Sequence, residues 1–163
     1  MSCACIGIYR KIRLDESFRE TLNMYQLLLK EDATWFSISL EWHMKPTFTD
    51  YERQQLTEVF GCFPQQEILI FGDCDRIFVA AYEITKHFGG LLRVNLVGEI
   101  DTIKSFPGIK IAVHKKKHKN PLKYEPDYYL VDHIFIREYF AKGIEHNFKR
   151  FQLDPFLPSV YYI

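Results

Sequence analysis

Residues 34–42 read TWFSISLEW, and their side chains alternate between apolar and polar. An alternation of period two predicts a β-strand with one face on a core and the other face in polar surroundings. Its apolar side carries Phe36, Ile38, Leu40 and Trp42. Strands of parallel sheets are usually apolar on both faces, whereas antiparallel strands commonly keep one polar face. This stretch therefore favours an α+β fold with a mixed or mostly antiparallel sheet.

Outward from this strand, periodicity and turn residues predict the other elements of the chain. Further strands are expected at residues 4–13, 67–71, 91–97 and 109–113, and helices at 15–31, 49–60, 76–88 and 133–142. A short helix is expected near residues 101–106, a last helical turn at 146–150, extended chain at 154–159 and an edge strand at 160–163. We expect one domain, residues 1–163, with its sheet covered by three to four helices.

Composition limits the classes of protein to which the chain can belong. It has 163 residues, of which 47% are hydrophobic and 26% charged, a composition typical of one globular domain and not of a disordered chain. Its 21 basic and 21 acidic residues balance, which makes a dedicated nucleic-acid binder unlikely on composition. The sequence has no run of 18 apolar residues and no recognisable signal peptide, so we expect a cytoplasmic protein without a membrane partner.

The four cysteines form no C-x-x-C pair, and we expect reduced, small apolar thiols. No set of residues has the spacing of a catalytic triad, a phosphate-binding loop or a zinc site. The sequence therefore predicts neither a cofactor nor a metal, and no catalytic residue.

An Asp-Cys-Asp turn at Asp73–Asp75 follows the expected strand at 67–71 and permits two interpretations. Two carboxylates at the end of a strand suit Mg²⁺, as in a metal-dependent enzyme acting on a phosphate or a sugar. Alternatively, Asp73 or Asp75 caps the helix that follows, which is a common role for aspartate. We keep the enzyme as an alternative function and treat the two aspartates also as candidate partner-binding residues.

The strongest charge feature lies at residues 110–123, which carry six lysines and no acidic residue. Three of them, Lys115, Lys116 and Lys117, are consecutive, and the segment is expected to be an exposed loop or hairpin tip. Such a loop fits an acidic protein surface or, as a second alternative, the phosphates of a nucleic acid. A solvated tip without a partner is the plain structural interpretation.

Trp35 falls on the polar side of the strand at 34–42. An outward-facing tryptophan is a candidate anchor for a protein contact, because Trp brings a large contact area with few rotatable bonds. With Lys115, Lys116 and Lys117 it completes the expected partner-binding set.

Two segments carry a family resemblance. Residues 72–98 read GDCDRIFVAAYEITKHFGGLLRVNLVG, an acidic turn, an apolar helix, a Phe-Gly-Gly stop and a strand, and residues 128–151 add an Asp-capped helix. Together they resemble small bacterial immunity proteins encoded beside polymorphic or contact-dependent toxins. The resemblance implies a protein that binds and neutralises a cognate toxin stoichiometrically, with no enzymatic activity of its own. It carries over no site residue.

Overall fold

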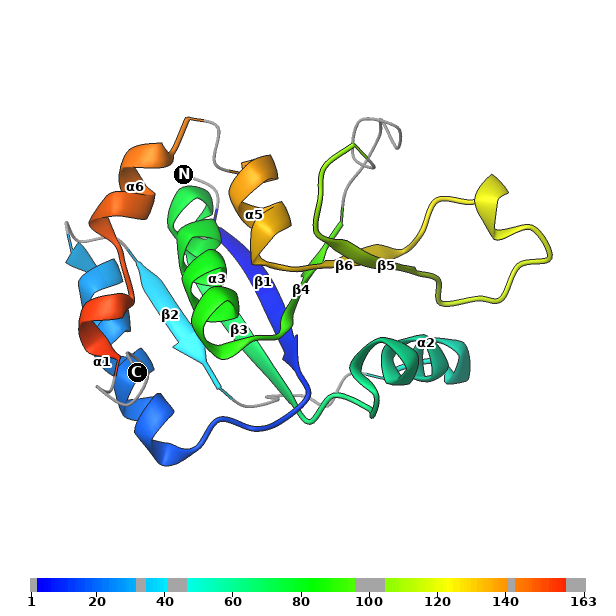
Figure 1. Ribbon diagram of the computed structural model, residues 1–163, viewed down its shortest axis with the longest axis horizontal. Coiled ribbons are helices and arrows are strands. Elements are labelled where there is room, and N and C mark those ends of the chain that lie inside the picture. Colours follow the sequence, from blue (N-terminus) through cyan, green and yellow to red (C-terminus); the bar gives the residue numbers. More distant parts are fainter. Residues whose placement is uncertain (1–2, 32–34, 41–46, 96–104, 141–142, 158–163) are drawn as a thin grey trace.

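The computed structural model describes residues 3–31, 35–40, 47–95, 105–140 and 143–157. In this part of the chain six strands form one sheet in the order β2-β3-β1-β4-β6-β5, and all neighbouring pairs are antiparallel (Figure 1). The strands are β1 (Cys3–Arg10), β2 (Phe36–Ser39), β3 (Gln66–Asp73), β4 (Leu91–Val94), β5 (Ile109–Val113) and β6 (Tyr128–Val131). The expected α+β fold is confirmed, and the described sheet is antiparallel throughout.

Five α-helices lie in the described ranges, where three to four were expected. They are α1 (Glu16–Leu29), α2 (Asp50–Phe60), α3 (Cys74–Phe88), α5 (His133–Phe140) and α6 (Glu145–Arg150), with short 3-10 helices η2 (Pro121–Lys123) and η3 (Asp154–Phe156). Within these same ranges, no helix combines the length and the apolar character that crossing a membrane requires.

The sheet buries apolar side chains on both of its faces. On one face, a large cluster joins the sheet to α1, α3, α5 and α6, and Ile8 of β1 belongs to it. On the other face, a smaller cluster joins β1, β4, β5 and β6 to Leu56 of α2, and Tyr9 of β1 belongs to that one. Because successive strand residues point to opposite faces, β1 contributes to both clusters.

Local hydrogen bonds and a glycine mark the two ends of α2, the helix that the sequence predicted at residues 49–60. The Thr49 hydroxyl accepts the Glu52 N–H at 3.1 Å, and the Glu52 carboxylate accepts the Thr49 N–H at 3.1 Å, which completes a capping box. Gly61 ends the helix in the left-handed conformation, with φ 81°. These bonds set the two ends of α2 and join only residues close in the sequence.

Several boundaries differ from the expectation. The strand β6 was missed, because all four of its side chains are buried and give no alternation. The strand expected at 34–42 is shorter and spans Phe36–Ser39. The helix α3 begins at Cys74, two residues before the expected start, and residues 154–156 form η3 where extended chain was expected. The short helix expected near 101–106 falls largely, and the edge strand at 160–163 wholly, outside the described residues.

Gly108 stands where β5 passes the start of α5. Its φ is +100°, and a Cβ atom there would lie 2.3 Å from Asp132 Oδ1 and 2.6 Å from the backbone nitrogen of Phe135. Asp132 caps α5, since its Oδ1 accepts the N–H groups of Ile134 at 2.9 Å and Phe135 at 3.2 Å. A side chain at Gly108 would therefore displace the cap as well as strain the backbone.

We predict that Gly108→Ala lowers the free energy of unfolding by about 3 kcal/mol, combining the left-handed backbone penalty with overpacking. Gly61→Ala is the control, because Gly61 has φ +81° in the left-handed region and the nearest described atom to its added Cβ is Lys11 Nζ, at an ordinary 3.5 Å. It should lose only about 1–2 kcal/mol. Urea unfolding of both variants measures the difference, and equal losses would contradict the packing argument.

Candidate functional site

The residues singled out in the sequence fall on opposite edges of the sheet. Trp35 directly precedes β2, one edge strand, whereas Lys115, Lys116 and Lys117 follow β5, the other edge strand. The Trp35 side chain is exposed, and its ring lies 6.4 Å from that of Phe71. The structure therefore does not bring the tryptophan and the lysines into one surface.

The two aspartates stand near Trp35, where β3 leads into α3. Asp73 occupies the N-cap position of α3, but its side chain makes no capping hydrogen bond, and Asp75 is exposed in the first turn. Within the described ranges, neither aspartate belongs to a group of three or more potential metal ligands. The observed arrangement places Asp73 at the cap position without the expected cap bond.

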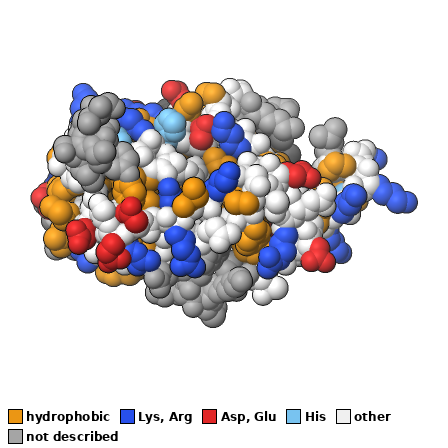
Figure 2. Space-filling view, turned by 60° about the horizontal axis from the view of Figure 1, so that its bottom comes forward, with side chains coloured by type: hydrophobic (Ala, Val, Ile, Leu, Met, Phe, Trp, Pro, Cys, Tyr) orange, Lys and Arg blue, Asp and Glu red, His pale blue; other side chains and the backbone are white. Residues whose placement is uncertain are grey.

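The connection from β5 to β6 projects from the body of the protein, and we name residues 114–127 the lysine hairpin (Figure 1). Its lysines, Lys115, Lys116, Lys117, Lys119 and Lys123, are all exposed. Basic side chains gather at this projecting end in Figure 2. The tip thus presents concentrated positive charge, as the sequence predicted.

The base of the lysine hairpin is fixed to α2 by a reciprocal pair of bonds. The side-chain amide of Gln55 donates to the carbonyl of His114 at 2.8 Å, and its oxygen accepts the N–H of His114 at 3.2 Å. One residue further, the carbonyl of Lys115 accepts the Thr49 hydroxyl at 2.7 Å, and its N–H donates to Asp127 at 2.6 Å. These bonds join the base of the lysine hairpin to α2 and to the segment that precedes it.

Two rings stiffen the tip itself. His118 stacks on Tyr124 with centroids 4.0 Å apart and planes at 16°. Tyr124 remains 53% exposed. An aromatic side chain is therefore displayed among the lysines in a defined position.

We predict that Gln55→Ala loosens the lysine hairpin. The change leaves the N–H and carbonyl of His114 without their side-chain partner, which should lower the free energy of unfolding by about 1–3 kcal/mol. Amide hydrogen exchange at residues 114–127 should accelerate more than elsewhere. The control is Gln54→Ala, because Gln54 is exposed and its side-chain amide donates to Glu58 at 3.4 Å on the same helix. Equal exchange in both variants would contradict the pinning role.

A buried polar layer runs beneath α2. Tyr128 donates its hydroxyl proton to Glu52 Oε2 at 2.8 Å, and Glu52 is only 2% exposed. The guanidinium of Arg93 lies 4.0 Å from the centre of the Tyr128 ring and donates to the Tyr9 hydroxyl at 3.1 Å. The positive guanidinium therefore faces the side of the sheet that α2 covers.

Arg93 also lines a cavity of about 440 Å³ with Glu67 and Cys5. Burial raises the pKa of Glu67 to about 7, and Arg93 opposes that rise. Glu67 lies across Gly7, where an added Cβ would be 2.2 Å from Glu67 Oε1. The cavity can accept a small polar ligand, but no group in it points to a particular one.

The raised pKa of Glu67 predicts a pH dependence of stability. Because the folded state holds this proton up to about pH 7 and the unfolded state releases it near 4.5, stability falls as pH rises through that window. Glu67→Gln should match wild type at pH 4 and exceed it at pH 8. The control is Glu138→Gln on the exposed side of α5. If the free energies of unfolding of wild type and Glu67→Gln changed in parallel between pH 4 and pH 8, the raised pKa of Glu67 would be refuted.

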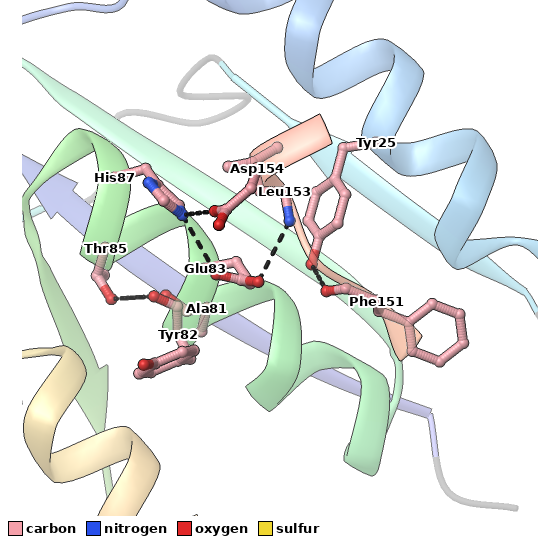
Figure 3. Close-up of polar contacts among 9 residues, drawn as sticks. All are labelled: Tyr25, Ala81, Tyr82, Glu83, Thr85, His87, Phe151, Leu153 and Asp154. Atoms are coloured by element: carbon pink, nitrogen blue, oxygen red, sulfur yellow. Dashed lines mark hydrogen bonds and ion pairs between the residues drawn. The ribbon is translucent and has the colours of Figure 1, made fainter. Parts of the chain in front are cut away.

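A third group of ionisable side chains lies between α3 and the C-terminal segment (Figure 3). Glu83 and His87 stand one turn apart on α3, and Asp154 begins η3. His87 Nε2 lies 2.5 Å from Asp154 Oδ1 and 3.5 Å from Glu83 Oε2. These atoms form the one set of three potential metal ligands found in the described residues.

Burial shifts the pKa values of this group. It raises the pKa of Glu83 to about 7, with Asp154 adding to the rise and the Leu153 N–H opposing it. It lowers the pKa of His87 below its ordinary 6.5, against the opposing pull of Asp154. Burial thus disfavours charge on both groups.

Sequence reasoning missed this cluster. None of its three residues was singled out from the sequence as a candidate site residue. The four-residue spacing of Glu83 and His87 on a predicted helix was a usable signal, since it puts both on one face. Asp154 lies 67 residues beyond His87, and no sequence pattern indicates that the two side chains meet in the fold.

Comparison of the chain with protein-family models, with curated protein sequences and with solved structures finds no match. The functional argument therefore rests on the chain's own residues.

Proposed function

We propose that this chain is an immunity protein that binds a cognate bacterial toxin in the cytoplasm and neutralises it by direct stoichiometric contact. The observation that supports the docking site is the lysine hairpin, a projecting basic element with a fixed base. The proposal assigns the first contact to this hairpin and an acidic surface to the toxin.

Charge separation within the chain favours this contact. Six lysines lie at residues 110–123, so the rest of the chain carries 15 basic against 21 acidic residues, a balance of −6. A separated patch of one sign steers an oppositely charged partner and accelerates association, even when the net charge is zero. The hairpin extends beyond the sheet, so an approaching surface meets the basic patch first.

Preorganisation adds to affinity. The Gln55, Thr49 and Asp127 bonds order the base of the hairpin in the free protein, so binding loses less conformational entropy than it would with a flexible loop. The exposed Tyr124 ring, stacked on His118, supplies an apolar anchor amid the charges. Trp35, on the far edge, would contact only a partner large enough to span the sheet.

The first test is rescue from toxicity. The product of the adjacent reading frame is expressed in host cells with and without this chain, and survivors are counted. We expect killing that the chain suppresses, and co-purification of the two proteins at 1:1. A harmless neighbour, or killing that the chain does not relieve, would contradict the immunity role.

The second test reverses the charge of Lys115, Lys116 and Lys117 to Glu. We expect the association rate with the toxin to fall about 10- to 100-fold at low salt, and the fall to shrink at high salt. The control reverses Lys11, Arg13 and Lys30, three exposed basic residues outside the hairpin that carry the same total charge. Equal effects of the two triple variants would reject the hairpin as the docking element. Salt-sensitive binding of the wild type to RNA or DNA, without toxin binding, would favour a nucleic-acid partner instead.

A further inference from the structure

The cluster of Glu83, His87 and Asp154 consists of buried ligand atoms with unused bonding capacity. Glu83 Oε2, His87 Nε2 and Asp154 Oδ1 are each buried; His87 Nε2 pairs with Asp154 Oδ1 at 2.5 Å, whereas Glu83 Oε2 has no hydrogen-bond partner among the described residues. The Glu83 side chain is only 4% exposed and points into the cluster (Figure 3). Buried polar atoms are normally paired, so an unpaired Glu83 oxygen that faces the His87–Asp154 pair calls for an explanation.

We propose that Glu83, His87 and Asp154 bind a divalent transition-metal cation, with Zn²⁺ the best fit. Their three ligand atoms all lie within 4.8 Å of one another. A single cation between them would be bound by all three ligand atoms. Its positive charge would also offset the negative charge of the carboxylates in this buried cluster.

The separations suit one ion. Ligands held about 2.1 Å from a tetrahedral zinc lie about 3.4 Å apart. His87 Nε2 and Glu83 Oε2 are 3.5 Å apart and need no movement. Asp154 Oδ1 is 2.5 Å from His87 Nε2 and must withdraw by about 1 Å. Its side chain is 46% exposed, which leaves it room to rotate.

The supporting bonds resemble those that orient metal ligands elsewhere. Glu83 Oε1 accepts the backbone N–H of Leu153 at 3.2 Å, which turns Oε2 toward the cluster. Leu153 is the neighbour of Asp154, so the same bond fixes the segment that carries the third ligand. Hydrogen bonds to a ligating carboxylate usually set its orientation in this way.

The donor set selects the class of metal. An imidazole nitrogen with two carboxylates suits zinc and its transition-metal neighbours, whereas Mg²⁺ and Ca²⁺ prefer oxygen alone. A cavity of about 190 Å³ adjoins Glu83 and Asp154 and leaves space for water as a fourth ligand. Lys86 and Arg137 also line that cavity, so binding should be weaker than at a purely acidic site.

Metal binding would join the C-terminal segment, residues 151–157, to α3. Residues 151–157 already meet α1 through the Tyr25 hydroxyl, which donates to the Phe151 carbonyl at 2.8 Å. A cation shared by α3 and η3 would join this segment to the central helix as well. Since the unfolded chain does not hold these ligands together, binding would stabilise the fold.

The test titrates chelator-treated protein with zinc sulfate in a calorimeter and follows thermal unfolding. We expect one Zn²⁺ per chain, little heat with Mg²⁺, and a rise in Tm of about 5–10 °C at a zinc concentration 100 times Kd. His87→Gln and Asp154→Asn should each weaken binding at least tenfold. The controls Asp75→Asn and His118→Gln remove the same groups from the β3–α3 turn and the lysine hairpin, and should bind as wild type does.

X-ray absorption of the wild-type zinc complex provides a readout that needs no variant to fold. We expect nitrogen and oxygen ligands without sulfur. The proposal is overturned by absence of zinc binding, by a sulfur ligand, by loss of binding in either control, or by wild-type affinity in Asp154→Asn. The experiment uses no toxin, so its failure leaves the proposed function unaffected, and the failure of that function leaves the metal site unaffected.

Discussion

The central strand β1 is the constraint on which the remaining structure depends. It pairs with β3 over eight residues and with β4 on its other side. Its neighbours Ile8 and Tyr9 are 0% and 1% exposed, on opposite faces of the sheet. A slip of one residue in either pairing would exchange the two faces and put each side chain against the wrong helix. The register of β1 therefore decides where α3 and α2 pack.

The side covered by α2 is held in a different way from the side covered by α3. Behind α3 the contacts are mainly apolar, whereas Glu52 and Gln55 of α2 are buried and bonded to Tyr128 and His114. Apolar contacts tolerate small sliding movements. When the partner of a buried carboxylate or amide is displaced, the free energy of unfolding falls by about 1–3 kcal/mol. The polar layer thus sets the position of α2 against β5 and β6. The same bonds fix the base of the lysine hairpin relative to α2.

Prediction from sequence succeeded where a pattern was local. The alternation at residues 34–42 and the periodicity that predicted the helices at 49–60 and 76–88 each lie within a short stretch of chain. The prediction failed at β6, because a strand between two others is buried on both faces and shows no alternation. Exposure of the lysines followed from their charge, but the bonds of Gln55 to His114 span 59 residues and leave no local signal.

The two regions with functional potential lie far apart. The lysine hairpin extends from β5 and β6 at one edge of the sheet, whereas η3 contacts α1, which packs on β2 at the other edge (Figure 1). Charge on the hairpin acts at long range and through solvent, so in the proposed function it steers the approaching toxin. Charge in the Glu83 cluster is buried, so it acts only on groups in contact and governs how the C-terminal segment is held. The proposed docking element therefore lies at one edge of the sheet, and the proposed metal site lies away from it, between α3 and η3.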